Sequence, residues 1–449
     1  MKTALKDTAK FIARQTIGRL PQPSSRLTGR LALDGGTPVR DKRFRPWANY
    51  HSGNLLQWVT SVGPSFRSIF LSGFEGLPQP RQRQFAAQWA EYCGCRHAVL
   101  LPHGTDALRI GLAAVFDHDG LEYGGEVIVP NLSFIASATA ALDRRFGVAL
   151  VDVDAGTLNL DPKRVEEAII PGKTRAIMPV HQFGQPADMT SLRTIATKHG
   201  LKVIEDAAQA HGAEWESGPV GSLGDAAGFS FQSAKNLTCG EGGILTTNDK
   251  QVFDRAYALH NAGRTPEMSG RWEHATLGWN CRPTEYQAAL LIHRFGMFER
   301  QQEKRSRNFQ TLRELMSDVA CLRPLEVHPG VRRHGMYMFV MRYHPEHCGG
   351  RALEEFLRAA GAEGAPLHRC YSSTMSDQLA MQKLIARRPE YIRVLPTPVA
   401  DDAVNRIVYI SANVFLGSEA DMGDIAAAVR KVERHYATSG SGMRELQRV

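Results

Sequence analysis

A single lysine, Lys235, stands between an apolar run at 227–231 and a glycine-rich turn at 240–243. A second apolar run, at 203–205, ends on Asp206. A lysine amine can form a Schiff base with an aldehyde, and a carboxylate can keep a pyridine nitrogen protonated. Burying such charges is costly unless each has a partner, so their positions at two predicted strand ends favour a functional role. The pair predicts a site for pyridoxal 5'-phosphate (PLP).

Three more residues have groups that can hold a phosphate. Gly104 and Thr105 join a predicted strand to a predicted helix, where orphan backbone N–H groups and the helix dipole stabilise an anion. Ser230 precedes Lys235 by five residues, so its hydroxyl can reach the same phosphate. Considered alone, Thr105 has a second interpretation, which is ordinary capping of the helix.

Phe134 and Gln209 are candidates for contact with an aromatic ring. Phe134 follows a predicted strand, where its ring can stack on a pyridine and exclude water, although a place in the core is the alternative. Gln209 comes three residues after Asp206 and can donate to a phenolic oxygen. The alternative for Asp206 is a carboxylate that caps its own turn.

These residues require a sheet that brings several strand ends together. Segments of helical length separate the first five of seven short apolar runs, which predicts an α/β fold with a mostly parallel sheet covered on both faces. The last two runs have no helix between them, so the sheet is expected to be mixed. The predicted strands cover 97–101, 126–129, 148–151, 176–180, 202–205, 227–231 and 243–246. The predicted helices cover 105–115, 133–142, 162–169 and 189–198.

The pattern changes after about residue 305, where a smaller α+β domain is predicted. Its elements are the strands 337–343 and 406–411 and the helices 352–360 and 421–436, and a long helix over 282–302 precedes them. The domain prediction is a basic N-terminal arm (1–45), a large cofactor-binding domain (46–305), a small C-terminal domain (306–438) and a flexible tail (439–449).

Composition and charge limit the class of protein. No apolar run approaches the roughly 20 residues of a membrane span. The seven cysteines are odd in number and lack zinc-site spacing, which argues against a disulfide framework or a metal site and favours a cytoplasmic setting. Residues 1–45 carry eleven Lys and Arg against three Asp, and so account for the whole net charge of +8. The remaining chain is neutral, and nucleic-acid binding is not expected.

The arm has an amphipathic stretch at 2–20 that could touch an acidic membrane surface or serve as a transit peptide. The alternative, an arm that packs on its own protein or frays in solvent, is the one expected here, so a membrane partner is not predicted.

The order of these residues resembles the DegT/StrS-type family of PLP-dependent sugar and cyclitol aminotransferases, which have the aspartate aminotransferase-like fold (type I). The resemblance covers roughly residues 30 to 435 and depends on the segments 31–39, 104–108, 179–189, 205–212 and 230–243. Ser230-Phe231-Gln232, with the early Gly35-Gly36-Thr37-Pro38, is most similar to the branch that acts on keto-cyclitols and on aminohydroxybenzoate-type precursors.

The resemblance implies a role for each candidate residue. Lys235 would be the Schiff-base lysine, and Asp206 the partner of the pyridine nitrogen. The other cofactor contacts would come from Gln209, Phe134, Ser230, Gly104 and Thr105. Asn280 would reach the phosphate of the neighbouring subunit, which implies a homodimer with shared active sites; its alternative role is to cap the following helix. Candidates for contact with substrate are His181, Arg264 and Arg282.

The implied activity is transfer of an amino group from L-glutamate or L-glutamine to a keto-cyclitol or keto-sugar, in secondary-metabolite or amino-sugar biosynthesis. Lys235 would shuttle the proton as general base and acid. Three alternatives stay open: an aromatic-precursor synthase using the same lysine, an idle regulator that keeps the fold, and a sugar dehydratase, which has histidine where this chain has Lys235. Departures from the family pattern at 261–264, at Pro283 and at 411–417 bear on the acceptor pocket.

Overall fold

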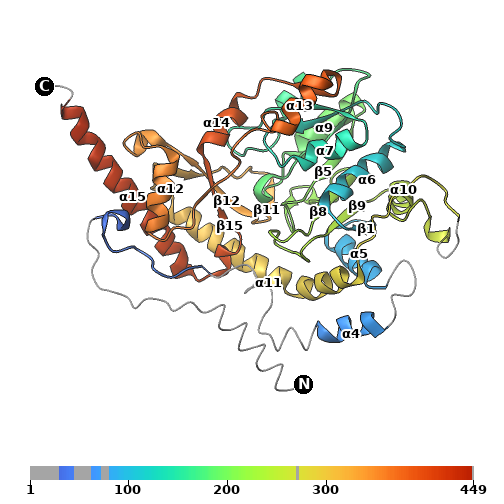
Figure 1. The fold of residues 1–449 in the computed structure, drawn as a ribbon, viewed down its shortest axis with the longest axis horizontal. Coiled ribbons are helices and arrows are strands. Elements are labelled where there is room, and N and C mark those ends of the chain that lie inside the picture. Colours follow the sequence, from blue (N-terminus) through green and yellow to red (C-terminus); the bar gives the residue numbers. More distant parts are fainter. Residues whose placement is uncertain (1–29, 45–61, 72–79, 269–272, 447–449) are drawn as a thin grey trace.

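The computed structural model describes residues 30–44, 62–71, 80–268 and 273–446, with side chains to 437 (Figure 1). In this view the large sheet and its helices lie on the right, and the helices α12 (Leu353–Ala362) and α15 (Glu419–Leu446) lie on the left. Helix α11 (Glu285–Leu315) runs beneath both parts and connects them.

The large sheet is mixed and mostly parallel, as the sequence predicts. Seven of its eight strands run in the same direction, and β9 is antiparallel to both of its neighbours, β1 and β8. The strands, in their order across the sheet, are β1 (His97–Leu101), β9 (Gly243–Thr247), β8 (Ala226–Ser230), β5 (Lys202–Asp206), β4 (Thr174–Ile177), β2 (Glu126–Pro130), β3 (Gly147–Val151) and β14 (Ile392–Val394).

The predicted number of seven strands is wrong, because β14 adds an eighth. It comes from the C-terminal third of the chain and pairs in parallel with β3, with Ile392 opposite Val148 and Val394 opposite Leu150. A strand of three residues carries too little alternation to be visible in the sequence. Its place is set by its partner strand.

Helices cover both faces of the sheet because alternate strand residues point in opposite directions. Ile128 packs with one set of helices, whereas Val127 and Val129 pack with the other. The first set is α5 (Pro80–Tyr92), α8 (Pro162–Ala168), α9 (Met189–His199) and part of α11. The second set is α6 (Gly104–Phe116), α7 (Ala136–Asp143), α10 (Lys250–His260) and α13 (Leu379–Arg387).

A second sheet with its own core forms the C-terminal region. It is antiparallel, in the order β10 (Leu322–Pro324), β12 (Met338–Tyr343), β15 (Ile407–Ser411) and β13 (His368–Arg369). Helices α12 (Leu353–Ala362) and α15 (Glu419–Leu446) pack on it together with the end of α11. The division near residue 305 stays a prediction; α11 contributes Phe298 to the large core and Phe309 to this one.

Several predicted helix boundaries differ from the structure, and the largest difference is the end of α11, which lies at Leu315, thirteen residues beyond the predicted 302. Helix α11 begins at Glu285 because Thr284 and Gln287 form a capping box, and Pro283 favours extended backbone in Arg282 before it. Helix α15 continues to Leu446, ten residues beyond the expected end. The flexibility of the 439–449 tail stays a prediction.

Part of the predicted N-terminal arm packs against the C-terminal region. Leu31 is buried there, and Arg40 forms ion pairs with Asp421 at 2.5 Å and Asp424 at 2.8 Å. The amphipathic stretch at 2–20 lies outside the described residues. Within the described part of the chain, none of the helices has both the length and the apolarity of a membrane span.

Candidate active site

A cavity of about 790 Å³ opens where the strands of the large sheet end. The strand ends contribute Asp206 of β5 and Ser230 of β8, and the C-terminal region closes the other side with Tyr337, Tyr371 and Tyr409. The cavity brings together most of the predicted cofactor residues, which are Gly104, Thr105, Phe134, Asp206, Gln209, Ser230 and Lys235.

Lys235 is the only lysine among the described residues that line the cavity. Its side chain is partly buried, and its amine donates a hydrogen bond to Tyr337 Oη at 3.3 Å. Burial lowers the pKa of the Lys235 amine to about 8. The negative charge of Asp206 acts in the other direction, but its effect is smaller. The amine is therefore unprotonated far more often than that of an exposed lysine, which is the state that a nucleophile or a base requires.

Asp206 is the last residue of β5 and is 5% exposed. Its Oδ2 accepts a hydrogen bond from Ser137 Oγ at 2.7 Å, and its Oδ1 accepts one from the backbone N–H of Ala208 at 3.2 Å. Burial raises the pKa of Asp206, and the two hydrogen bonds and the Lys235 charge oppose that rise. A cation next to this carboxylate would remove the cost of keeping it ionised.

Gln209 is held with its amide nitrogen toward the tyrosines. Its Oε1 accepts from the backbone N–H of Phe183 at 2.8 Å, so Nε2 is the end that donates to Tyr371 Oη, at 3.3 Å. Because the carbonyl oxygen is occupied by a backbone donor, the orientation of the amide is fixed. Gln209 therefore presents a donor to the cavity, as the predicted contact with a phenolic oxygen requires.

The candidate phosphate site is formed by the first turn of α6 and the end of β8. The first N–H groups of a helix have no partner within it, and Gly104 and Thr105 are the first two residues of α6. An added Cβ on Gly104 would lie 2.7 Å from the Cβ of Ser230, so only glycine permits this approach. Gly243 is required for a similar reason, since its Cβ would lie 2.2 Å from the carbonyl oxygen of His103.

Phe134 is an aromatic side chain left 64% exposed in the wall of the cavity. A ring exposed in the wall of a cavity is available to stack on an aromatic ligand. Its position excludes the alternative of a core residue.

The other candidates lie outside the cavity. His181 is fully buried; it donates from Nε2 to Glu205 at 3.0 Å and accepts at Nδ1 from the N–H of Ala187, also at 3.0 Å. Both ring nitrogens are thus occupied, and the predicted substrate contact of His181 is wrong for this chain's cavity. Glu205 also accepts three backbone N–H bonds, so this is a structural network.

Asn280, Arg264 and Arg282 gather near Asn261, outside the cavity of their own chain. Asn280 is exposed and pairs with Asn261 in a β-bridge, and Arg282 donates to Asn261 Oδ1 at 3.2 Å. Arg264 donates to the Asn261 carbonyl at 3.4 Å. Their predicted roles toward a neighbouring subunit or a substrate stay predictions.

Sequence reasoning missed Ser137, Tyr337 and Tyr371, which contact the three central side chains. Ser137 was within reach of a local argument, because it lies one helical turn after Ser133 and Phe134. The tyrosines had no such signal, since Tyr337 is 102 residues from Lys235 and Tyr371 is 162 from Gln209.

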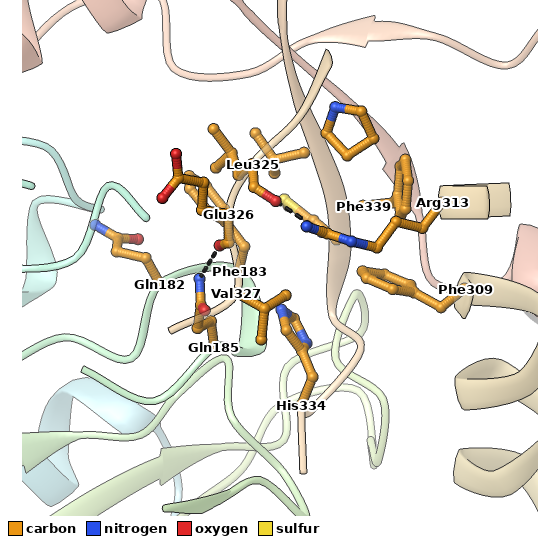
Figure 2. Close-up of a pocket in the computed structure, with 13 residues that line it drawn as sticks. Gln182, Phe183, Gln185, Phe309, Arg313, Leu325, Glu326, Val327, His334 and Phe339 are labelled. Atoms are coloured by element: carbon orange, nitrogen blue, oxygen red, sulfur yellow. Dashed lines mark hydrogen bonds between the residues drawn. The ribbon is translucent and has the colours of Figure 1, made fainter. Parts of the chain in front are cut away.

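A second cavity, between the two regions, has a volume of only about 20 Å³. Figure 2 shows two hydrogen bonds in its wall, from Gln185 Nε2 to the Glu326 carbonyl at 3.1 Å and from Arg313 Nη1 to the Leu325 carbonyl at 2.7 Å. This volume suits a single water molecule and excludes a sugar-sized ligand. The cavity at the strand ends, which brings the predicted cofactor residues together, is the candidate active site.

Known proteins resemble the chain over most of its length. A profile of the DegT/DnrJ/EryC1/StrS aminotransferase family matches residues 67–430. The L-glutamine:2-deoxy-scyllo-inosose aminotransferase of Streptoalloteichus tenebrarius is 35% identical over 423 residues, covering 90% of this chain and 98% of the relative. The L-glutamine:scyllo-inosose aminotransferase of Streptomyces griseus is 34% identical over 419 residues, covering 90% and 97%. The crystal structure of 3-amino-5-hydroxybenzoic acid synthase has a TM-score of 0.74 and 28% identity, covering 87% and 98%.

Proposed function

The chain belongs to the DegT/DnrJ/EryC1/StrS aminotransferase family, and from this membership we propose that it is a PLP-dependent enzyme that transfers an amino group to a keto-cyclitol. Its fold is type I, as the sequence resemblance predicts. The relatives carry L-glutamine in their names, which favours L-glutamine over L-glutamate as the donor. The reaction would belong to the biosynthesis of an aminocyclitol antibiotic.

The described residues fit PLP. The first turn of α6 and the Ser230 hydroxyl would hold the phosphate, and Phe134 would cover one face of the ring. Gln209 Nε2 would donate to the phenolic oxygen. Among the described residues, hydrogen-bond donors but no ion-pair partner contact the buried Asp206 carboxylate, so a protonated ring nitrogen would supply the missing charge. When bound, PLP supplies an electron-withdrawing ring that stabilises negative charge on the substrate carbon.

Lys235 is the residue that would carry the proton. With a pKa of about 8, its Nζ is unprotonated in about one molecule in ten at pH 7 and in more as the pH rises. An unprotonated Nζ could take a proton from the α-carbon of the amino donor and become an ammonium group. It would then release that proton to the carbon derived from the cofactor's aldehyde. General acid–base catalysis of this kind contributes about 10²–10⁴-fold.

The space next to Lys235 is large enough for a ring-shaped acceptor. A smaller cavity of about 200 Å³ adjoins the main one, and the two share Tyr337, Met338 and Tyr409 in their walls. This adjoining cavity is also bounded by Ser411 and Asn413, in the segment where the sequence departs from the family pattern. We assign the acceptor to this side.

A homodimer with shared active sites is part of the proposal. Asn280 is exposed and outside its own chain's cavity, which is the position expected of a residue that reaches a neighbour's phosphate. Arg264 and Arg282 lie in the same place and would be available to the neighbouring site.

The observation that carries the proposal is that Lys235 and Asp206 share one cavity, although Asp206 ends β5 and Lys235 lies in the turn between β8 and β9. The test is to incubate the purified protein and PLP with L-glutamine labelled with ¹⁵N at the α-amino group, and with scyllo-inosose or 2-deoxy-scyllo-inosose. Mass spectrometry should detect the label in an aminocyclitol. A nucleotide-linked keto-sugar as acceptor, and L-glutamate as donor, complete the comparison. If no ketone is aminated, the proposal is wrong.

A second candidate function is an aromatic-precursor synthase, which the similarity to 3-amino-5-hydroxybenzoic acid synthase favours. Such an enzyme would remove water from a cyclic amino acid using the same Lys235, without moving nitrogen between molecules. Formation of an aromatic product that absorbs in the ultraviolet, with no transfer of ¹⁵N, would distinguish it.

A further inference from the structure

Tyrosines of the C-terminal region contact two central side chains of the candidate active site. Tyr337 immediately precedes β12, and its Oη accepts a hydrogen bond from Lys235 Nζ at 3.3 Å. The same Nζ lies 4.4 Å from the centroid of the Tyr337 ring, so hydroxyl and ring both face the amine. Tyr371 contacts Gln209 in a comparable way.

The residue next to Lys235 binds the backbone that precedes Tyr337. Asn236 is almost fully buried, and its Nδ2 donates to the carbonyl oxygens of Gly335 at 2.6 Å and Met336 at 3.1 Å. The N–H of Gly335 donates in turn to the carbonyl of Gly184 at 2.7 Å. Consecutive residues, 235 and 236, therefore contact the side chain of Tyr337 and the backbone just before it. This arrangement fixes the separation of the amine and the tyrosine.

We propose that Tyr337 is a positioning residue for the Lys235 amine, and that Asn236 is the tether that keeps it in place. That the amine transfers a proton rests on the proposed function, whereas the contact between Lys235 and Tyr337 does not depend on it. While Lys235 is not bonded to the cofactor, the Tyr337 hydroxyl holds Nζ at the cavity wall, from where it can take up and return a proton.

The contact also affects the charge of the amine. Tyr337 is 8% exposed, and burial raises its pKa to about 12, so the hydroxyl stays neutral at physiological pH. A neutral phenol oxygen that accepts from Nζ, and a ring face 4.4 Å away, both favour the ammonium form of Lys235. On this proposal, Tyr337 stabilises the ammonium form of Lys235 through these two contacts and so opposes the effect of burial on the pKa of the amine.

The test compares the full-length chain, freed of cofactor, as wild type, Tyr337→Phe and Tyr409→Phe. Tyr409 lines the same cavity without a hydrogen bond to Lys235, so it is the matched control. Competitive acetylation across a pH series, read by mass spectrometry of the peptide with residue 235, gives the pKa of the amine. Tyr337→Phe should lower that pKa by about one unit. Tyr409→Phe should leave it unchanged.

Two further measurements keep the result unambiguous. Asn236→Ala should lower the pKa of Lys235 in the same direction as Tyr337→Phe, because it releases Tyr337. Circular dichroism should show unchanged secondary structure in Tyr337→Phe. An unchanged pKa in Tyr337→Phe, or an equal fall in Tyr409→Phe, would overturn the proposal. No substrate is present in this experiment, so its result does not depend on the proposed function. Either proposal can therefore fail while the other holds.

Discussion

Gly104 and Ser230 approach each other so closely that a Cβ on Gly104 would lie 2.7 Å from the Cβ of Ser230. The first turn of α6 thereby comes directly against the end of β8, and the donors of both elements converge on one point. Such convergence can hold a phosphate with backbone N–H groups and one hydroxyl, without a lysine or arginine.

The first prediction concerns this contact. Gly104→Ala should weaken PLP binding by about tenfold or more, because the new methyl group must push the helix start away from Ser230. Fluorescence titration of the cofactor-free chain with PLP measures this. Gly423→Ala in α15 is the control, since its methyl group would meet nothing within 4 Å. Equal PLP affinity in both variants would contradict a phosphate site at this point.

Ser137→Ala should shift the pH dependence of the enzyme. The hydrogen bond from Ser137 lowers the pKa of Asp206, so its loss should raise that pKa, and the carboxylate should become protonated at higher pH. The acid limb of kcat/KM should therefore move upward by about one unit. Thr139→Ala on the same helix, where the hydroxyl bonds to the Ala136 carbonyl, should leave the profile unchanged. A downward shift in Ser137→Ala would show that the assignment is wrong.

Phe134→Ala separates ligand binding from stability. The ring is 64% exposed, so its loss should change the free energy of unfolding of the cofactor-free chain by less than about 0.5 kcal/mol. Stacking on the cofactor would be lost, and the Kd for PLP should rise about tenfold. Leu379→Ala, which removes another exposed apolar side chain outside the cavity, should change neither quantity. Marked destabilisation by Phe134→Ala would indicate a core role.

His181→Ala should have the opposite signature. The imidazole donates to Glu205 and accepts from the Ala187 N–H within a fully buried network. Removing it leaves the buried Ala187 N–H without its acceptor, takes one hydrogen bond from Glu205 and opens a cavity, so the free energy of unfolding should fall by about 2–4 kcal/mol. Chemical denaturation measures this loss. The KM values for donor and acceptor should stay within about twofold at a temperature where the variant is folded. A large rise in KM with unchanged stability would restore the predicted substrate contact.

Local patterns in the sequence were sufficient for most of the large sheet. The apolar run at 97–101 is the strand β1 to the residue, and the helix after it differs from the predicted 105–115 by one residue at each end. Such runs are local, and their burial on both faces leaves a continuous apolar signal. Strand β14 left no such signal, because its three residues, one of them Arg393, depend on pairing with β3.

The residues of the candidate site likewise fall into those that local patterns predict and those that only the fold identifies. Lys235, Asp206 and Ser230 are visible because each ends or follows an apolar run. The prediction for His181 was wrong because the sequence does not show on which side of the sheet a residue lies. Glu205 and Asp206 are neighbours on one strand, and successive strand residues point to opposite faces. Asp206 lines the cavity, whereas Glu205 binds His181 inside the protein. The tyrosines at 337 and 371 come from a distant part of the chain, and only the folded arrangement of the two regions identifies them.

Reduction with sodium borohydride tests the central claim most directly. The protein, purified with PLP, should be yellow, and borohydride should bleach it and fix one phosphopyridoxyl group on the peptide that contains residue 235. Lys235→Ala should show neither the colour nor the label, whereas Lys250→Ala, which changes an exposed lysine paired with Asp254, should keep both. A label on any other lysine, or a colourless protein in excess PLP, would contradict the account.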